Sequence, residues 1–105
     1  MKILISIILS GLISSVSIAS EKDYDRCDQI ETNSRKIMQL RQGTTPMKTM
    51  IKIVKETFEG SKSLNMQIAI VTSAYKQPRY STDRMKKRAV EDFANDVYLE
   101  CLTNS

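Results

Sequence analysis

The chain has 105 residues, with 16 Lys and Arg against 12 Asp and Glu, no His, two Cys and three Gly. This length allows one domain at most, and 41% hydrophobic with 27% charged residues is an ordinary globular composition. Without His the chain lacks the commonest general base and the commonest metal ligand, and two cysteines are too few for a structural zinc site. We therefore expect a protein that is not an enzyme and holds no cofactor and no metal.

Residues 1–19 have the three-part layout of a secretory signal peptide. Lys2 gives a short positive start, an apolar run follows, and the small residues Ser17 and Ala19 stand before a charged segment. This pattern predicts cleavage after Ala19 and a destination in the periplasm or outside the cell. The alternative is an uncleaved membrane anchor, for which the apolar stretch is short.

Two cysteines lie near the ends of the mature chain, residues 20–105. In an exported protein, a lone pair such as Cys27 and Cys101 typically forms one structural disulfide. A redox-active pair usually has the Cys-X-X-Cys spacing, which these residues lack. We expect a stabilising bond that joins the two ends of a single helical domain.

Four helices are expected in this domain. Asp23 or Asp25 caps the first, in which apolar and small residues recur at three- and four-residue steps until Gly43 ends it. The second begins with Thr45 as N-cap and Pro46 at the first helical position. Gly60 ends this helix, and its apolar stripe is formed by Met47, Met50, Ile51, Val54 and Phe58.

The third helix is capped by Ser63 and ended by Pro78, because the residue before a proline avoids helical backbone. Its β-branched run, residues 68–72, also fits a strand, but we favour a helix because the chain offers no second strand. Ser81 or Thr82 opens the fourth helix, which carries an apolar stripe to its end.

The connections between these helices are short, which favours antiparallel packing of neighbours. In an up-and-down order, the start of the first helix and the end of the fourth lie at the same end of the bundle. Cys27 and Cys101 then meet there. The sequence therefore predicts a small all-α antiparallel bundle of about four helices, stapled by one disulfide.

The turn before the fourth helix carries Tyr75, Arg79 and Tyr80 around a proline. Tyr and Arg concentrate binding energy at protein interfaces, so these three residues are candidates for partner binding. In a structural alternative, the tyrosines pack across the corner and Arg79 bonds carbonyls at a helix end. The sequence leaves both interpretations open.

The fourth helix begins with a basic stretch that contains Arg84, Lys87 and Arg88. Positive charges oppose the helix dipole there, since a helix N-terminus favours anions. The stretch is either a solvated surface or a docking surface for an acidic partner, an anionic lipid or a phosphate. We expect no nucleic acid partner for an exported chain.

The carboxylates show no catalytic arrangement. Glu91 and Asp92 are adjacent on a helix and point to different sides, so they cannot flank one bond. The other helically spaced pairs have no nucleophile or Gly-rich loop beside them. A small glycan hydrolase is therefore disfavoured.

Segments spread over most of the mature chain resemble, in order and spacing, a loose set of short exported proteins of unknown function from phages, prophages and Gram-negative bacteria. The resemblance implies a compact helical unit with joined ends, encoded by a mobile element and without an established activity. The matching segments are Cys27, residues 37–43, Met47 with Met50, Ala74 with Tyr75, residues 78–82 and residues 92–101.

The expected function is that of a small exported binding or accessory protein without a transmembrane span in its mature form. By analogy of architecture with phage superinfection-exclusion and lysis-control factors, its expected partner is an envelope or periplasmic protein. The alternative is a periplasmic stress chaperone. That alternative is weakened because a chain without His lacks the usual switch at about pH 6.

Overall fold

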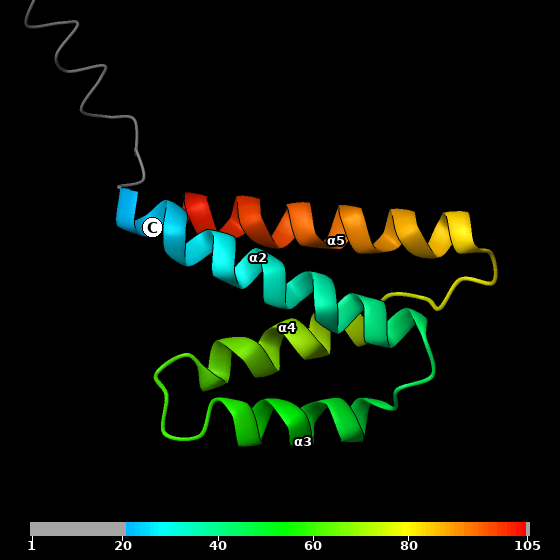
Figure 1. Cartoon of the computed structure of the whole chain (residues 1–105), viewed down its shortest axis with the longest axis horizontal. Coiled ribbons are helices and arrows are strands. Elements are labelled where there is room, and N and C mark those ends of the chain that lie inside the picture. The colour runs from blue at the N-terminus through cyan, green and yellow to red at the C-terminus, as the bar shows by residue number, and fades with distance from the viewer. Residues whose placement is uncertain (1–20, 105) are drawn as a thin grey trace, which may run out of the picture.

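The computed structural model describes residues 21–104, which form four helices. Figure 1 shows them stacked in the order α3, α4, α2 and α5, and the packed pairs are α3 with α4, α4 with α2, and α2 with α5. The predicted all-α bundle is confirmed, whereas the segment predicted to be a signal peptide, residues 1–19, lies outside the described residues. The helices are α2 (Glu21–Gln42), α3 (Met47–Thr57), α4 (Leu64–Lys76) and α5 (Asp83–Thr103).

This stacking differs from a square four-helix bundle, in which each helix packs against the helices that precede and follow it in the chain. Here α2 lies between α4 and α5, and these two helices pack on α2 rather than on each other. The extended connection of residues 77–82 spans the distance between them. One side of the bundle therefore stays open.

Local signals set several helix ends. The hydroxyl of Thr82 accepts a hydrogen bond from the main-chain N–H of Met85 at 3.2 Å, which caps α5 as expected. Gln77, before Pro78, has extended backbone (φ −74°, ψ 145°) and ends α4. Residues 68–72 are helical, so the strand alternative is wrong.

The predicted N-cap and the predicted end of α3 were both wrong. Pro46 rather than Thr45 is the N-cap, because the carbonyl of Pro46 accepts the first helical hydrogen bond, from Met50 at 3.1 Å. The helix ends at Thr57, ahead of Gly60. Gly60 instead takes a φ of +72° in the following turn, a conformation that residues with a Cβ rarely adopt.

The core is built from the apolar faces of all four helices. Met38 on α2 and Val71 on α4 are fully buried in it, Phe93 on α5 is nearly so, and Met50 and Val54 attach α3 to it. Burial of such side chains contributes most of the stability of a small domain. Because α2 lies in the middle of the stack, it supplies buried residues along its whole length.

The disulfide predicted from the sequence is present. Cys27 on α2 and Cys101 on α5 are bonded, with Cα atoms 5.7 Å apart and 74 positions of separation in the chain. The bond therefore closes nearly the whole described chain into one loop and holds the start of α2 against the end of α5.

Replacing both cysteines by alanine should lower the free energy of unfolding by about 4 kcal/mol, because the unfolded chain regains the entropy that the loop removes. Urea unfolding of the double variant and of the reduced wild type checks this, and the two should agree. A double variant as stable as the oxidised protein would contradict the expectation.

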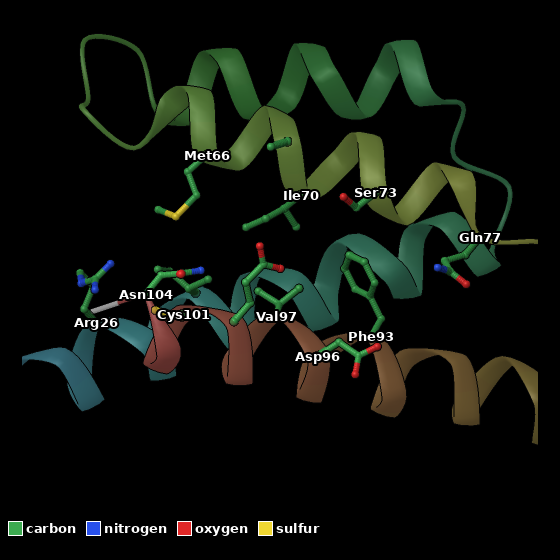
Figure 2. A pocket seen from close by; sticks show the side chains of 13 residues that line it. Arg26, Met66, Ile70, Ser73, Gln77, Phe93, Asp96, Val97, Cys101 and Asn104 are labelled. Carbon is green, nitrogen blue, oxygen red and sulfur yellow. The ribbon is translucent and has the colours of Figure 1, made fainter. Parts of the chain in front are cut away.

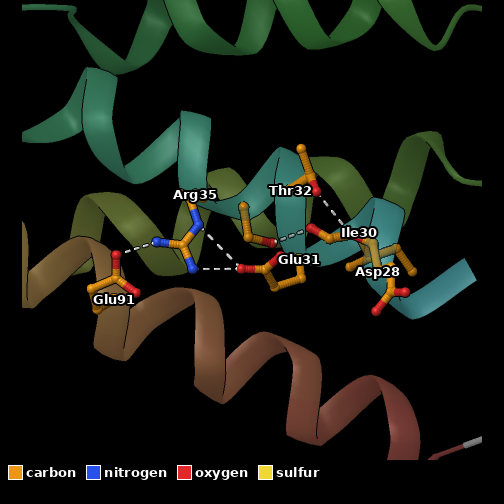
Figure 3. A network of polar contacts seen from close by, with 7 residues as sticks. Asp28, Ile30, Glu31, Thr32, Arg35 and Glu91 are labelled. Carbon is orange, nitrogen blue, oxygen red and sulfur yellow. Dashed lines mark hydrogen bonds and ion pairs between the residues drawn. The ribbon is translucent and has the colours of Figure 1, made fainter. Parts of the chain in front are cut away.

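Polar contacts also fix α5 along α2 (Figure 3). Arg35 on α2 bonds Glu31 of its own helix, with Nη2 2.6 Å from Oε1, and reaches across to Glu91 on α5. The hydrogen bonds to Glu91 and Glu31 raise the pKa of Arg35. Nearby, removal from water and a hydrogen bond with Asp28 raise the pKa of the Tyr98 phenol. Such half-exposed contacts are worth about 0–1 kcal/mol each, so they set register more than stability.

One polar side chain in the core is incompletely satisfied. Gln67 on α4 is 1% exposed, and its Oε1 has no hydrogen-bond partner in the structure. A buried polar group without a partner costs about 1–3 kcal/mol.

Replacing Gln67 by methionine, which has a similar volume, should therefore raise the free energy of unfolding by about 1–2 kcal/mol. The same change at Gln29, which is exposed on α2, serves as the control and should have little effect. Urea unfolding measures both. A loss of stability in Gln67→Met would show that the buried amide is satisfied in solution.

Candidate functional site

The open side of the bundle contains a cavity of about 410 Å³. Helix α2 forms its floor, and α4 and α5 form its walls (Figure 2). Ile30 on α2, Ile70 on α4 and Phe93 on α5 are buried apolar residues that line it. The half-exposed side chains of Met66 and Val97 extend this apolar lining toward solvent. We call this cavity the α4–α5 groove.

The edge of the α4–α5 groove is polar and carries more negative than positive charge. Asp96 and Glu100 stand one helical turn apart on α5, and Arg26 contributes from the start of α2. Small residues, Ala69 and Ser73, line the wall formed by α4 and keep the groove wide. An apolar floor with an acidic edge is a surface suited to an amphipathic helix that carries basic residues.

Sequence reasoning did not identify the groove. Ile70 and Phe93 belong to ordinary apolar stripes. The sequence pattern of such a stripe is the same whether or not a neighbouring helix covers that face. Ala69 and Ser73 gave the one available signal, since small residues beside an apolar stripe permit close approach of another element. That signal alone does not reveal which faces remain open.

Tyr75, a residue singled out in the sequence, holds the connection between α2 and α3. Its hydroxyl donates a hydrogen bond to the carbonyl of Thr45 at 2.7 Å, and the guanidinium of Arg41 lies 5.1 Å from the centre of its ring. Burial raises the pKa of Tyr75, and the charge of Arg41 partly offsets this rise.

Gln42, at the end of α2, fastens the connection between α4 and α5. It is 3% exposed; its Nε2 donates to the carbonyl of Pro78, and its Oε1 accepts from the main-chain N–H of Tyr80, both at 2.8 Å. Its own carbonyl accepts from Lys86 Nζ at 2.6 Å and from Arg79 Nε at 3.4 Å. We call this set of hydrogen bonds the Gln42 clamp.

The six candidate binding residues thus fall into two groups. Tyr75, Arg79 and Tyr80 are engaged in the corner, where Arg79 bonds a helix-end carbonyl as the structural alternative expects. Arg84, Lys87 and Arg88 are exposed on the first turns of α5. The importance of Gln42 was missed, because a glutamine near a helix end has no local signature.

Gln42→Ala should lower the free energy of unfolding by about 2 kcal/mol, because it leaves the N–H of Tyr80 and the carbonyl of Pro78 without partners. Gln39→Ala makes the same chemical change at an exposed position of α2 and should cost less than about 0.5 kcal/mol. Chemical unfolding compares them. Equal effects would show that the clamp adds nothing to stability.

Within residues 21–104, no cluster of three His, Cys, Asp or Glu side chains is placed to hold a metal ion. None of the four helices described has the length and hydrophobicity required to cross a bilayer. Comparison of the chain with family models, with curated proteins and with solved structures yields no match.

Proposed function

We propose that this chain is a small exported, non-enzymatic accessory protein that binds an envelope or periplasmic protein through the α4–α5 groove. The groove carries the proposal, since the accessible apolar side chains of Met66 and Val97 lie in it beside an acidic edge, over buried apolar residues from three helices. The disulfide between Cys27 and Cys101 supports the location, because such bonds persist in oxidising compartments outside the cytoplasm.

The groove favours a helical segment of the partner. Ile70 and Val97 point toward each other from the two walls (Figure 2), so an inserted helix meets apolar side chains on both sides. Asp96 and Glu100, spaced one turn apart, match basic residues spaced by a turn on that helix. The partner therefore presents an amphipathic helix with Lys or Arg beside its apolar stripe.

The resemblance to phage, prophage and Gram-negative exported proteins supports a role at the envelope. A binding protein of this kind modulates superinfection exclusion or lysis by occupying a helix that its target needs. The chaperone alternative draws no support from residues 21–104, where the buried side chains other than apolar ones are Ser34, Gln42 and Gln67. None of these gains charge as the pH falls.

The test begins with the full chain, carrying a C-terminal tag, expressed in a Gram-negative host. Periplasmic extraction followed by intact-mass measurement should give a protein that starts at Ser20 and has lost two hydrogens to the disulfide. Recovery from the cytoplasm with free thiols would overturn the export half of the proposal.

Ala69→Arg fills the groove without altering its floor, because Ala69 is exposed on the wall. Thr49→Arg is the control, since it adds the same side chain at an exposed position of α3. Periplasmic proteins that the wild type and Thr49→Arg both capture should not be captured by Ala69→Arg. Capture that Ala69→Arg leaves unchanged, or no specific capture at all, would contradict binding through the groove.

A further inference from the structure

The charges of this chain are segregated between its two ends. Residues 40–48 and 76–88 contain eight Lys or Arg and one acid, Asp83. Residues 21–31 and 91–100 contain nine acids and two basic residues. Because α2 and α5 run antiparallel, the first pair of segments lies at the end with the α2–α3 and α4–α5 connections, and the second pair extends from the middle of α2 and α5 to the end with the disulfide (Figure 1). We call these the basic end and the acidic end.

Three of the eight cations of the basic end are held in place by uncharged groups. Arg41 donates to the main-chain carbonyl of Gln77 from Nε at 3.2 Å and Nη2 at 3.0 Å, while Arg79 and Lys86 donate to the carbonyl of Gln42. Carbonyl oxygens carry no net charge, so these bonds position the cations and leave their field intact.

Within residues 21–104, the ion pair that joins a cation of this stretch to an acid is long and exposed to solvent. Arg88 Nε lies 3.9 Å from Asp92 Oδ2, with the two side chains 71% and 69% exposed. Such pairs screen little charge. The basic end therefore presents a concentrated positive field to its surroundings.

Exposed apolar side chains lie among these cations. Leu40, Met47 and Met85 are each 39% exposed, and they come from α2, α3 and α5 respectively. Three helix ends thus contribute one apolar residue each to the same end of the bundle. Basic residues together with protruding apolar residues form a surface suited to the headgroup region of an anionic membrane.

A cavity at the basic end gives this surface a place for a phosphate. It has a volume of about 410 Å³, lies beside the connection of residues 43–46, and is lined by Arg41, Arg79 and the threonines Thr44 and Thr45. Arginine and hydroxyl donors are the usual partners of phosphate oxygens.

We propose that the basic end docks on membranes that contain anionic phospholipid, with Leu40, Met47 and Met85 entering the headgroup region and a lipid phosphate held between Arg41 and Arg79. The cations and exposed apolar residues of this surface come from the ends of three helices and from two connections, so they are spread over this end of the bundle rather than along one strip that a peptide would cover. A flat, negatively charged layer therefore fits it better than an acidic protein segment. This binding is separate from the α4–α5 groove.

The test is co-sedimentation of the oxidised protein, as isolated from cells, with vesicles of phosphatidylglycerol and phosphatidylcholine or of phosphatidylcholine alone. Binding should require phosphatidylglycerol and weaken as salt is added. Equal binding to both kinds of vesicle, or no binding to either, would overturn the proposal. The first result would indicate insertion without regard to lipid charge.

Matched charge variants locate the contact. Arg84→Gln with Lys87→Gln should weaken vesicle binding about 30-fold, since each removed cation near a membrane surface counts for about fivefold. Lys55→Gln with Lys62→Gln removes the same charge from exposed positions away from the basic end and should have little effect. Equal losses from both pairs would show a response to net charge alone and would contradict docking by the basic end.

A second pair tests the apolar contribution. At raised salt, Met85→Gln should bind vesicles more weakly than the wild type does. Leu99→Gln, at a 61% exposed residue near the acidic end, should bind as the wild type does. Circular dichroism confirms that each variant is folded. The protein could instead bind soluble polyglutamate, with the same variants weakening that binding, and not bind vesicles. This result would assign the surface to an acidic protein and overturn the proposal. Ala69→Arg should leave vesicle binding unchanged, which separates this test from that of the groove.

Discussion

The antiparallel pair of α2 and α5 is fastened at one end by the Cys27–Cys101 disulfide and at the other by the Gln42 clamp. Between these fastenings, Arg35 and its carboxylate partners hold the register of the two helices. Helix α4 then packs on the remaining face of α2, and α3 packs on α4. The position of every other element follows from this pair, including the separation of α4 from α5.

Two surfaces result from the same arrangement. Because α4 and α5 both pack on α2, the α4–α5 groove is lined by apolar residues from three helices. Because α2 and α5 run in opposite directions, the acids of residues 21–31 and 91–100 lie from the middle of the pair to one end, and the cations of residues 40–48 and 76–88 gather at the other end. The groove receives Asp96 and Glu100 from the acidic end, so its charge preference and the segregation of charge have one origin.

The features that were predicted correctly depend on neighbouring residues or on topology. Thr82 reaches an N–H three residues ahead, Pro78 restricts the residue before it, and two cysteines at the ends of an up-and-down bundle have only each other as partners. The features that were missed depend on distant residues. Gln42 acts on atoms 36 to 44 positions away, and the groove arises from the choice of α4 rather than α3 as the neighbour of α2. That choice is made by side-chain fit across helices, for which a single sequence has no periodic signal.

Opposite charges at the two ends give the bundle a permanent electric dipole along α2 and α5. Near any charged surface such a dipole experiences a torque, and the molecule is turned before any side chain touches that surface. The range of this effect is set by the salt around it, and is about 8 Å at physiological ionic strength. A negatively charged layer would thus rotate Cys27 and Cys101 away from itself, together with the part of the groove that Arg26 and Asn104 line beside them.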